Sequence, residues 1–359
     1  MSTDIETARL LFDGQRLAQA RTFSGKLKGE LAKEIGVSPA AIGQFESGVA
    51  GPSAATLARL ALAVGVPVGY FASDRERFSL REEDAHFRSL RSTSKRDRSR
   101  ARAQVERLAE VVAALELQVR FPGPDLPQFA PDTAPETAAR DLRKLWSLGD
   151  GPVRNMVGLL ERKGVIVARL EVADVGVDAF SCRLGTRPYV ILATNKDDAA
   201  RSRFDAAHEL GHLLLHEDAS PGDPSVEREA NRFAAEFLVP AHSISPMLPR
   251  RVDWRAFAGL KIEWRVSIQM LLFRARELKA ISDAAYRRAM MEMSKRDWRK
   301  NEPASIGDPE QPELLGRAMG LLGARRAFTI ERLATELRLG SEGLDPYHEL
   351  LRPVEPLAV

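Results

Sequence analysis

The sequence predicts a multidomain, mainly α-helical protein with an α+β core in its middle third. Three observations lead to this prediction: short helical patterns with tight turns near the N-terminus, three Val- and Ile-rich segments followed by strongly patterned helices, and helical patterning through the last third. The length of 359 residues also exceeds the ~100–200 residues of a typical domain. We therefore expect separate units at residues 1–72, 73–132, 133–246 and 247–359.

The composition is that of an ordinary globular protein of the cytoplasm. Apolar residues make up 44% of the sequence, and no stretch approaches the ~20 apolar residues that span a bilayer. The N-terminus shows no basic segment before an apolar run, so we expect no secretory signal and no membrane partner. Cys182 is the only cysteine, which excludes an intrachain disulfide and fits a reducing compartment. We interpret Cys182 as a buried strand residue.

The first unit has the pattern of a small helical domain. We expect helices over residues 6–20, 28–35, 38–46 and 54–64. Gly36 ends the second of these as a C′ glycine, and Ser38-Pro39 opens the third with an N-cap followed by proline. This is a helix-turn-helix layout, in which helix 38–46 enters the major groove of DNA.

The run from Glu30 to Gly48, with Pro52 and the Leu57-x-x-Leu60-Ala61 that follows, resembles phage-repressor-type (XRE family) DNA-binding domains over residues 9–71. The resemblance implies DNA as a partner. The expected DNA-facing residues are Ser38, Pro39, Ala40, Gly43 and Gln44. Only Gln44 suits a base edge, and seven basic against six acidic side chains in residues 1–72 attract phosphates weakly. A protein-docking role for this unit is the alternative.

The connector at 73–132 is basic and then apolar. Eight basic residues lie between Arg88 and Arg107, and they suit either DNA phosphates or a solvated helix face. An apolar stripe at three- and four-residue steps follows from Val105 to Val119. Through this stripe the 100–120 helix would form a homodimer or pack on its own domain. Five prolines in residues 121–135 predict a linker and a domain boundary.

The third unit combines strands with helices. Strands are expected over residues 165–170, 175–184 and 188–194, and helices over 136–147, 152–163, 198–216 and 225–238. On the third of these helices, His208 and His212 are four positions apart and share one face. Two such imidazoles hold Zn²⁺, and Glu209 between them is the expected general base. Gly211 is expected to leave space close to the metal.

A catalytic zinc site needs a third protein ligand. The candidates downstream are His216, Glu217, Asp218, Asp223, Glu227 and Glu229. Glu227 shares a face of the next helix with Asn231, Ala234 and Leu238, and the two apolar members direct that face inward. Glu229 lies about 200° away on that helix, so we favour Glu227. The alternative is that Glu227 is an acid favoured by the helix dipole.

The segments Phe204–His216 and Glu227–Pro240, with Gly151–Val157 upstream, resemble the ImmA/IrrE family of metallopeptidases over about 135–245. The resemblance implies a gluzincin-like domain that holds zinc through two histidines and the glutamate matching Glu227. It also implies a protein substrate, typically a helix-turn-helix repressor whose cleavage releases stress or mobile-element genes. The family's transition-state-stabilising residue has no clear match here. His242 and Tyr189 are weak candidates, and packing or surface roles suit both better.

The last third is expected to be a helical region without chemistry of its own. Residues 260–275 resemble the helices that follow the peptidase domain in longer ImmA/IrrE-type proteins. Residues 301–312 form a polar linker to a second small helical unit at 313–350. Trp254, Trp264 and Trp298 are interpreted as packing residues.

These patterns favour one function over two others. The leading hypothesis is a cytoplasmic DNA-binding regulator whose zinc endopeptidase cleaves a repressor-type protein. The second is a transcription factor whose metal site is a sensor or is catalytically silent. The third is an antitoxin-like partner of a toxin that binds its own promoter.

Overall fold

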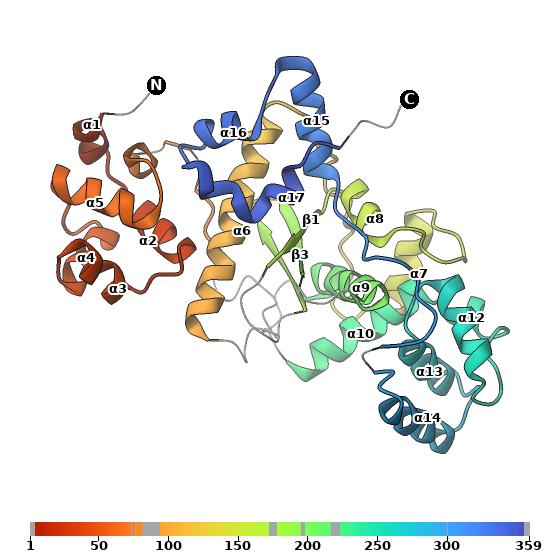
Figure 1. Ribbon diagram of the computed structural model, residues 1–359. Coiled ribbons are helices and arrows are strands. Elements are labelled where there is room, and N and C mark those ends of the chain that lie inside the picture. The colour runs from red at the N-terminus through yellow and green to blue at the C-terminus, as the bar shows by residue number, and fades with distance from the viewer. Residues whose placement is uncertain are drawn as a thin grey trace.

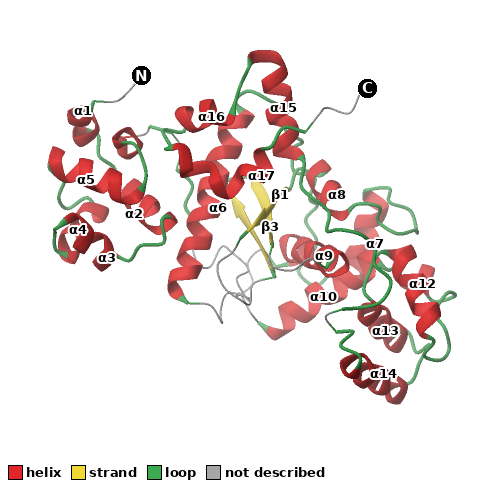
Figure 2. Cartoon of the chain, viewed as in Figure 1, coloured by secondary structure: helices red, strands yellow, loops and turns green. Residues whose placement is uncertain are grey.

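The computed structural model describes residues 4–72, 74–75, 77–80, 94–171, 178–194, 198–216, 223–299 and 301–354. Helices dominate, and one small sheet lies in the middle of the molecule (Figures 1 and 2). The predicted fold class, mainly helical with an α+β core, is confirmed. In the described part of the chain, no helix is long and apolar enough to cross a bilayer.

The N-terminal helices form their own group at one end of the molecule (Figure 1). They are α1 (Ile5–Leu10), α2 (Gly14–Phe23), α3 (Lys28–Ile35), α4 (Pro39–Ser47) and α5 (Ala54–Val64), followed by the 3₁₀ helix η1 (Val68–Ala72). Buried Leu17, Leu31, Ile42 and Leu57 join them in one core. The predicted helices over 28–35, 38–46 and 54–64 are therefore confirmed to within a residue at their ends.

The single helix expected over residues 6–20 is wrong, because the chain breaks at residues 11–13 into α1 and α2. Asp13 is the N-cap of α2 and accepts a hydrogen bond from the backbone N–H of Gln15 at 2.8 Å. Gly14 begins α2 against the end of α4, where a Cβ would lie 2.0 Å from the carbonyl oxygen of Phe45. The absence of a side chain at Gly14 therefore allows the first residue of α2 to lie against the end of α4.

The basic connector contains one long helix, α6 (Lys95–Glu116), which Ser94 caps. Its stripe residues Val105, Leu108, Val112 and Leu115 are buried in one core with α2, one face of the sheet and the C-terminal helices. The stripe therefore packs within its own chain, which was one of the two alternatives. A homodimer through this helix remains a prediction. Of the basic segment, Arg88 and Arg91 lie outside the described residues.

A buried polar network joins α2 to α6. The guanidinium of Arg16 pairs with Glu110 at 2.6 Å, and Gln19 donates to the same carboxylate at 3.1 Å. The hydroxyl of Tyr70 donates to Gln19 at 2.7 Å, and the guanidinium of Arg107 lies 3.6 Å from the ring centre of Phe23. Part of the predicted basic face is therefore interior, and it binds the N-terminal helices to α6.

The sheet has the strand order β1-β3-β2. Strand β1 (Ile166–Leu170) pairs parallel with β3 (Arg187–Ala193), which pairs antiparallel with β2 (Ala179–Leu184). These bounds confirm the three predicted strands, except that Val175, in the expected start of the second strand, lies outside the described residues. Tyr189, Ile191 and Cys182 point to the core of α6, whereas Val190 and Leu192 point to the other core. Cys182 is the buried strand residue that was expected.

Helices cover this second face of the sheet. They are α7 (Pro135–Leu145), α8 (Met156–Arg162), α9 (Ala199–Leu215) and α10 (Pro224–Leu238). Helix α9 packs on β2 and β3, and α10 packs against both α9 and α7. The short helix α11 (Ala241–Ile244) and the group α12 (Trp254–Trp264), α13 (Ile268–Glu277) and α14 (Asp283–Lys295) extend the same core. The rings of Trp254 and Trp298 meet edge to face, as expected of packing residues.

The final helices return to the other core. They are α15 (Leu314–Arg326), α16 (Ile330–Glu336), the 3₁₀ helix η4 (Ser341–Tyr347) and α17 (His348–Leu351). The segment 301–312, expected to be a polar linker, is bound to α8, α9 and α12 through residues near its two ends. Glu302 pairs with Lys261 at 2.9 Å, and Glu310 accepts from the backbone N–H of Met156 at 2.7 Å and pairs with Arg203 of α9. Glu302 and Glu310 thus accept from the first backbone N–H groups of α13 and α8.

We predict that Glu110→Leu loosens the N-terminal helices, because it leaves the guanidinium of Arg16 buried without its counter-ion. Such a loss costs about 3 kcal/mol, and amides of α2 should then exchange with solvent roughly 100-fold faster. Hydrogen exchange followed by mass spectrometry measures this. Glu292→Leu, which breaks the exposed pair with Arg296, is the control and should change exchange little. Equal rates in wild type and Glu110→Leu would contradict the prediction.

Candidate metal centre

Helix α9 presents its two histidines to α10. Asp198 caps the helix, accepting from the backbone N–H of Arg201 at 2.8 Å. Ala206, Leu210 and other apolar residues of α9 are buried against the sheet. The face that carries His208 and His212 is directed toward Glu227 of α10.

Helix α10 begins with Asp223 as N-cap and Pro224 at its first position, so Glu227 falls in the first turn. Phe233, Ala234 and Leu238 are buried, which fixes the rotation of the helix. Glu227 is 5% exposed and faces α9. Local sequence therefore determines where α10 starts, and its apolar face determines where Glu227 points.

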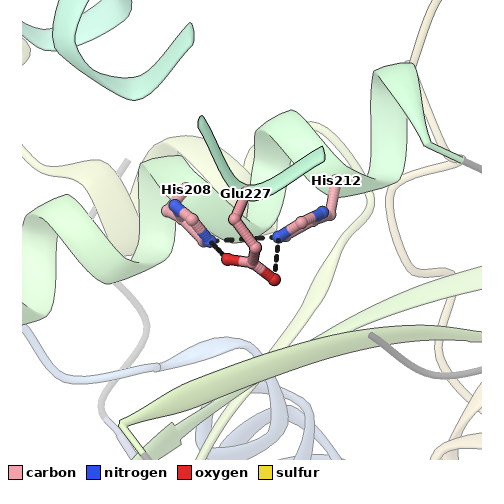
Figure 3. Close-up of side chains that lie close together, drawn as sticks. All are labelled: His208, His212 and Glu227. Carbon is pink, nitrogen blue, oxygen red and sulfur yellow. Dashed lines mark hydrogen bonds and ion pairs between the residues drawn. The ribbon is translucent and has the colours of Figure 1, made fainter. Parts of the chain in front are cut away.

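The structure brings His208, His212 and Glu227 together (Figure 3). The two Nε2 atoms are 3.0 Å apart. The Glu227 carboxylate lies 3.2 Å from Nε2 of His208 and 3.7 Å from Nε2 of His212. One nitrogen or oxygen atom from each of the three side chains lies within 4.8 Å of the others. Two imidazoles and one carboxylate converging in this way are the ligand types of a catalytic zinc site.

A second layer of polar side chains touches the two histidines on their outer nitrogens. Nδ1 of His208 is 3.1 Å from the amide oxygen of Asn231, and Nδ1 of His212 is 3.1 Å from Nδ1 of His216. Glu229 lies 3.1 Å from the remaining nitrogen of His216. His216 and Glu229, which were candidate ligands, thus lie behind the cluster. Asp223 is a helix cap, and Glu217 and Asp218 lie outside the described residues.

Glu209 lies on the neighbouring side of α9, buried against the sheet. Its carboxylate accepts a hydrogen bond from the hydroxyl of Ser181 in β2 at 2.7 Å. Burial raises the pKa of Glu209 to about 7, which is suited to a group that takes up and releases a proton near neutral pH. The sequence analysis did not identify Ser181. Strand alternation could have indicated it, because it places this hydroxyl on the opposite face of β2 from Phe180 and Cys182.

The electrostatics of the cluster differ between the two histidines. Burial lowers the pKa of His212 to about 4, so its imidazole is neutral at ordinary pH. Burial also lowers the pKa of His208, but the carboxylates of Glu227 and Glu209 outweigh it and the pKa is raised. Neutral imidazole is the form that binds a metal ion, so the environment of His212 favours metal binding directly.

Gly211 does not leave space beside the cluster, contrary to expectation. A Cβ at this position would lie 3.0 Å from the ring of Phe233 and 3.4 Å from the Cα of Ala230. Both neighbours belong to α10, so the glycine lets the two helices approach closely. His242 forms an exposed pair with Asp150 at 2.8 Å, and Tyr189 is buried on the opposite face of the sheet. Neither candidate for transition-state stabilisation is thus placed at the cluster.

A cavity of about 470 Å³ lies between α9, α10, α13 and α14. Phe204 lies one helical turn before His208, Asn231 binds that histidine, and both side chains line the cavity. Helices α13 and α14 contribute the opposite wall, which includes Met270, Phe273 and Tyr286. His208 is the most accessible of the three clustered side chains, at 15% against 2% for His212 and 6% for Glu227.

The second predicted site is the outer surface of α4. Ser38, Pro39, Ala40 and Gln44 are exposed, and Gly43 is half-buried. Ser38 accepts from the backbone N–H of Ala41 at 3.1 Å, so its hydroxyl caps the helix. The surface is available, as predicted, while contact of these residues with DNA remains a prediction.

Two family models match the chain. Residues 17–71 match a helix-turn-helix model, and residues 160–276 match the IrrE N-terminal-like domain of the peptidase M78 family. A search of curated proteins finds no significant match. Residues 17–71 are therefore similar to helix-turn-helix domains, and residues 160–276 are similar to a peptidase-family domain, in the predicted order. The second match runs through α12 and into α13, which share the core of α9 and α10.

Because α9 and α10 meet at Gly211, we predict that Gly211→Val lowers the melting temperature by several degrees. Phe233 is fully buried and has no room to move, and overpacking of this kind costs about 1–3 kcal/mol. Circular dichroism during heating measures the change. Gly259→Val in α12 is the control, since a Cβ there meets nothing within 4 Å. The same melting temperature for both variants would show that the contact is not tight.

Proposed function

We propose that this protein is a DNA-binding regulator of the cytoplasm that contains a zinc-dependent endopeptidase. The single observation that carries the proposal is the convergence of His208, His212 and Glu227, with Glu209 buried beside them on the same helix. This set combines three metal-binding side chains with an acid–base group whose pKa is about 7. The family match to a peptidase domain supports the same assignment.

The donor set fits zinc on the chemistry of its side chains. Zinc in hydrolases is bound by imidazole nitrogen and carboxylate oxygen, with three protein ligands and one further position for water. Here the outer nitrogens of both histidines are occupied by Asn231 and His216, which leaves the two Nε2 atoms to face Glu227. His208, His212 and Glu227 would hold the ion. When bound, zinc supplies Lewis acidity and lowers the pKa of water.

The chain's own residues account for the remaining requirements of peptide hydrolysis. Glu209 takes a proton from water and returns it to the leaving amine, and its raised pKa suits both transfers. Ser181 orients the Glu209 carboxylate through the 2.7 Å hydrogen bond. The cavity lined by Phe204, one helical turn before His208, and by Phe273 would receive a segment of the substrate.

The substrate we propose is a protein of the helix-turn-helix repressor type, cleaved during a stress or mobile-element response. The proposal is supported by the ImmA/IrrE resemblance of residues 135–245, by the peptidase-family match over residues 160–276, and by the helix-turn-helix match in the same chain. A shared operator would bring the peptidase close to a repressor already bound there. Zinc-loaded protein mixed with candidate repressors, with and without operator DNA, tests this proposal.

We predict that Glu209→Gln lowers repressor cleavage at least ~100-fold, because general acid–base catalysis contributes a factor of about 10²–10⁴. The amide cannot take up the proton, while His208, His212 and Glu227 remain. Cleavage followed by gel electrophoresis and zinc content by atomic absorption are measured on the same sample. Ser294→Ala, far from the cluster in α14, is the control. Equal cleavage by wild type and Glu209→Gln would refute the proposed role.

One observation favours a second candidate, a transcription factor that senses a metal. Helix α6 packs in one core with both α2 and the sheet that carries Ser181, so a change at the cluster has a physical route to the DNA-binding helices. Operator affinity measured with and without a chelator separates the two candidates. Metal-dependent DNA affinity without any proteolysis would favour the sensor.

The α4 surface leads to a prediction about sequence readout. Gln44→Ala should weaken binding to a selected operator by about 1–3 kcal/mol and relax the preference at one base pair, because the amide suits an adenine edge. Operators are first selected from random DNA, and affinities are then compared by fluorescence anisotropy. Glu6→Ala in α1 is the control. If both variants bind like wild type, Gln44 does not read the operator.

A further inference from the structure

The chain places a third histidine behind the cluster, and nothing in the proposed catalysis uses it. His216 follows the last residue of α9, is 4% exposed, and stands one helical turn beyond His212. Its Nδ1 lies 3.1 Å from Nδ1 of His212, and its Nε2 lies 3.1 Å from a carboxylate oxygen of Glu229. Both ring nitrogens of His216 therefore already have partners, so the imidazole has no nitrogen left with which to join the cluster as a ligand.

We propose that Glu229 and His216 form a hydrogen-bonded relay that positions His212 as a metal ligand. In this relay Nδ1–H of His212 donates to Nδ1 of His216, and Nε2–H of His216 donates to Glu229. The inference rests on the proposed metal site and deepens it, since it assigns a role to two residues outside the ligand set. His216 and Glu229 are positioning residues and touch neither substrate nor the reacting atoms.

The direction of the two hydrogen bonds follows from Glu229. A carboxylate only accepts hydrogen bonds, so the nitrogen of neutral His216 that faces Glu229 must carry the proton. Nδ1 of His216 then carries a lone pair and can only accept a hydrogen bond. The hydrogen bond between the two rings therefore requires a proton on Nδ1 of His212. That leaves Nε2 of His212 unprotonated, 3.0 Å from Nε2 of His208. The Glu227 carboxylate also faces this nitrogen, but at 3.7 Å it is farther away than a hydrogen bond, unlike Glu229 at 3.1 Å from His216. Only this tautomer presents a lone pair to a metal ion.

The two histidines of the cluster are supported unequally. His208 is held by Asn231, whose amide presents oxygen or nitrogen depending on its rotation and therefore determines no tautomer alone. His212 is held by His216, which is itself bound to the charged carboxylate of Glu229. Helix α10 supplies Glu227, Glu229 and Asn231 within its first two turns, so a single helix provides one cluster member and a support for each histidine.

The first test is direct observation of the tautomer in protein labelled with ¹⁵N at histidine. Long-range ¹H–¹⁵N spectra of the metal-free wild type should show His212 protonated at Nδ1 and unprotonated at Nε2. In His216→Leu this preference should be lost, whereas His216→Asn should retain it because its side-chain oxygen can occupy the position of Nδ1. A His212 tautomer that is the same in wild type and His216→Leu would overturn the relay.

The second test is zinc affinity, measured by competition with a chromophoric chelator. Loss of an outer hydrogen-bond partner weakens metal binding by about 10- to 100-fold, which we expect for His216→Leu, with His216→Asn closer to wild type. A merely space-filling role would give the reverse order, because leucine fills the site better than asparagine. His348→Ala, which removes an exposed histidine of α17, is the control. Unchanged affinity in a folded His216→Leu would overturn the relay.

If His216→Leu does not fold, the Glu229→Gln variant tests the relay in its place. Glu229 is 46% exposed, so its replacement leaves the core intact, and the exposed Glu263 replaced by glutamine is its control. We expect Glu229→Gln to mix the tautomers of His212 and to weaken zinc binding several-fold; no change in either would overturn the relay. None of these measurements requires proteolysis. A correct tautomer and zinc affinity without repressor cleavage would therefore refute the peptidase proposal alone.

Discussion

The close contact between α9 and α10 is the constraint on which the proposed site depends. Gly211 lets the buried ring of Phe233 approach within van der Waals distance of α9. At that separation Glu227 reaches both histidines from the first turn of α10. Asn231 reaches the outer nitrogen of His208, and Glu229 reaches His216, which in turn contacts His212. A wider spacing would leave the same residues on the same faces without bringing their atoms together. The close packing of α9 and α10 therefore brings His208, His212 and Glu227 together.

The surroundings reinforce this pair of helices. Glu236 of α10 pairs with Arg274 of α13 in the interior, and Arg143 of α7 donates to the carbonyl of Phe237 at 2.6 Å. On α9, buried Arg203 pairs with Glu310 from the segment that leads to the C-terminal helices. These two ion pairs and one hydrogen bond hold α9 and α10 against α7, α13 and the segment 301–312. They restrict movement of the two helices, as a preorganised metal site requires.

The sequence predicted the elements that have strong local signals. Gly36 marks the end of one N-terminal helix, and the capping residues Ser38 and Ser53 mark the starts of the next two. The apolar residues that share a helix face with Glu227 predict that its side chain points inward. Gly14 gave no comparable signal, because its role depends on the carbonyl of Phe45, a contact between distant parts of the chain. For the same reason Glu310 was assigned to a linker and Ser181 was overlooked. Long-range partners of polar residues are not encoded in local periodicity.

The organisation of the chain also differs from a row of independent units. Helix α6 was expected to be a connector, yet its apolar side belongs to one core with α2, the sheet and α15–α17. The helix-turn-helix domain and the peptidase-type domain thus share a buried element, with Arg16 and Glu110 at the junction. A shared helix transmits strain between domains more readily than a flexible linker would, which is why DNA binding and metal binding deserve measurement on the intact chain.

Both the proposed peptidase and the proposed relay require one metal ion to bind between His208, His212 and Glu227. An anomalous difference map from crystals of the zinc-loaded protein, recorded at the zinc edge, tests it most directly. We expect one strong peak at ~2.0–2.2 Å from both Nε2 atoms and a Glu227 oxygen, with His216 and Glu229 outside the coordination sphere. A peak that takes His216 or Glu229 as a direct ligand, or none at this position, would contradict it.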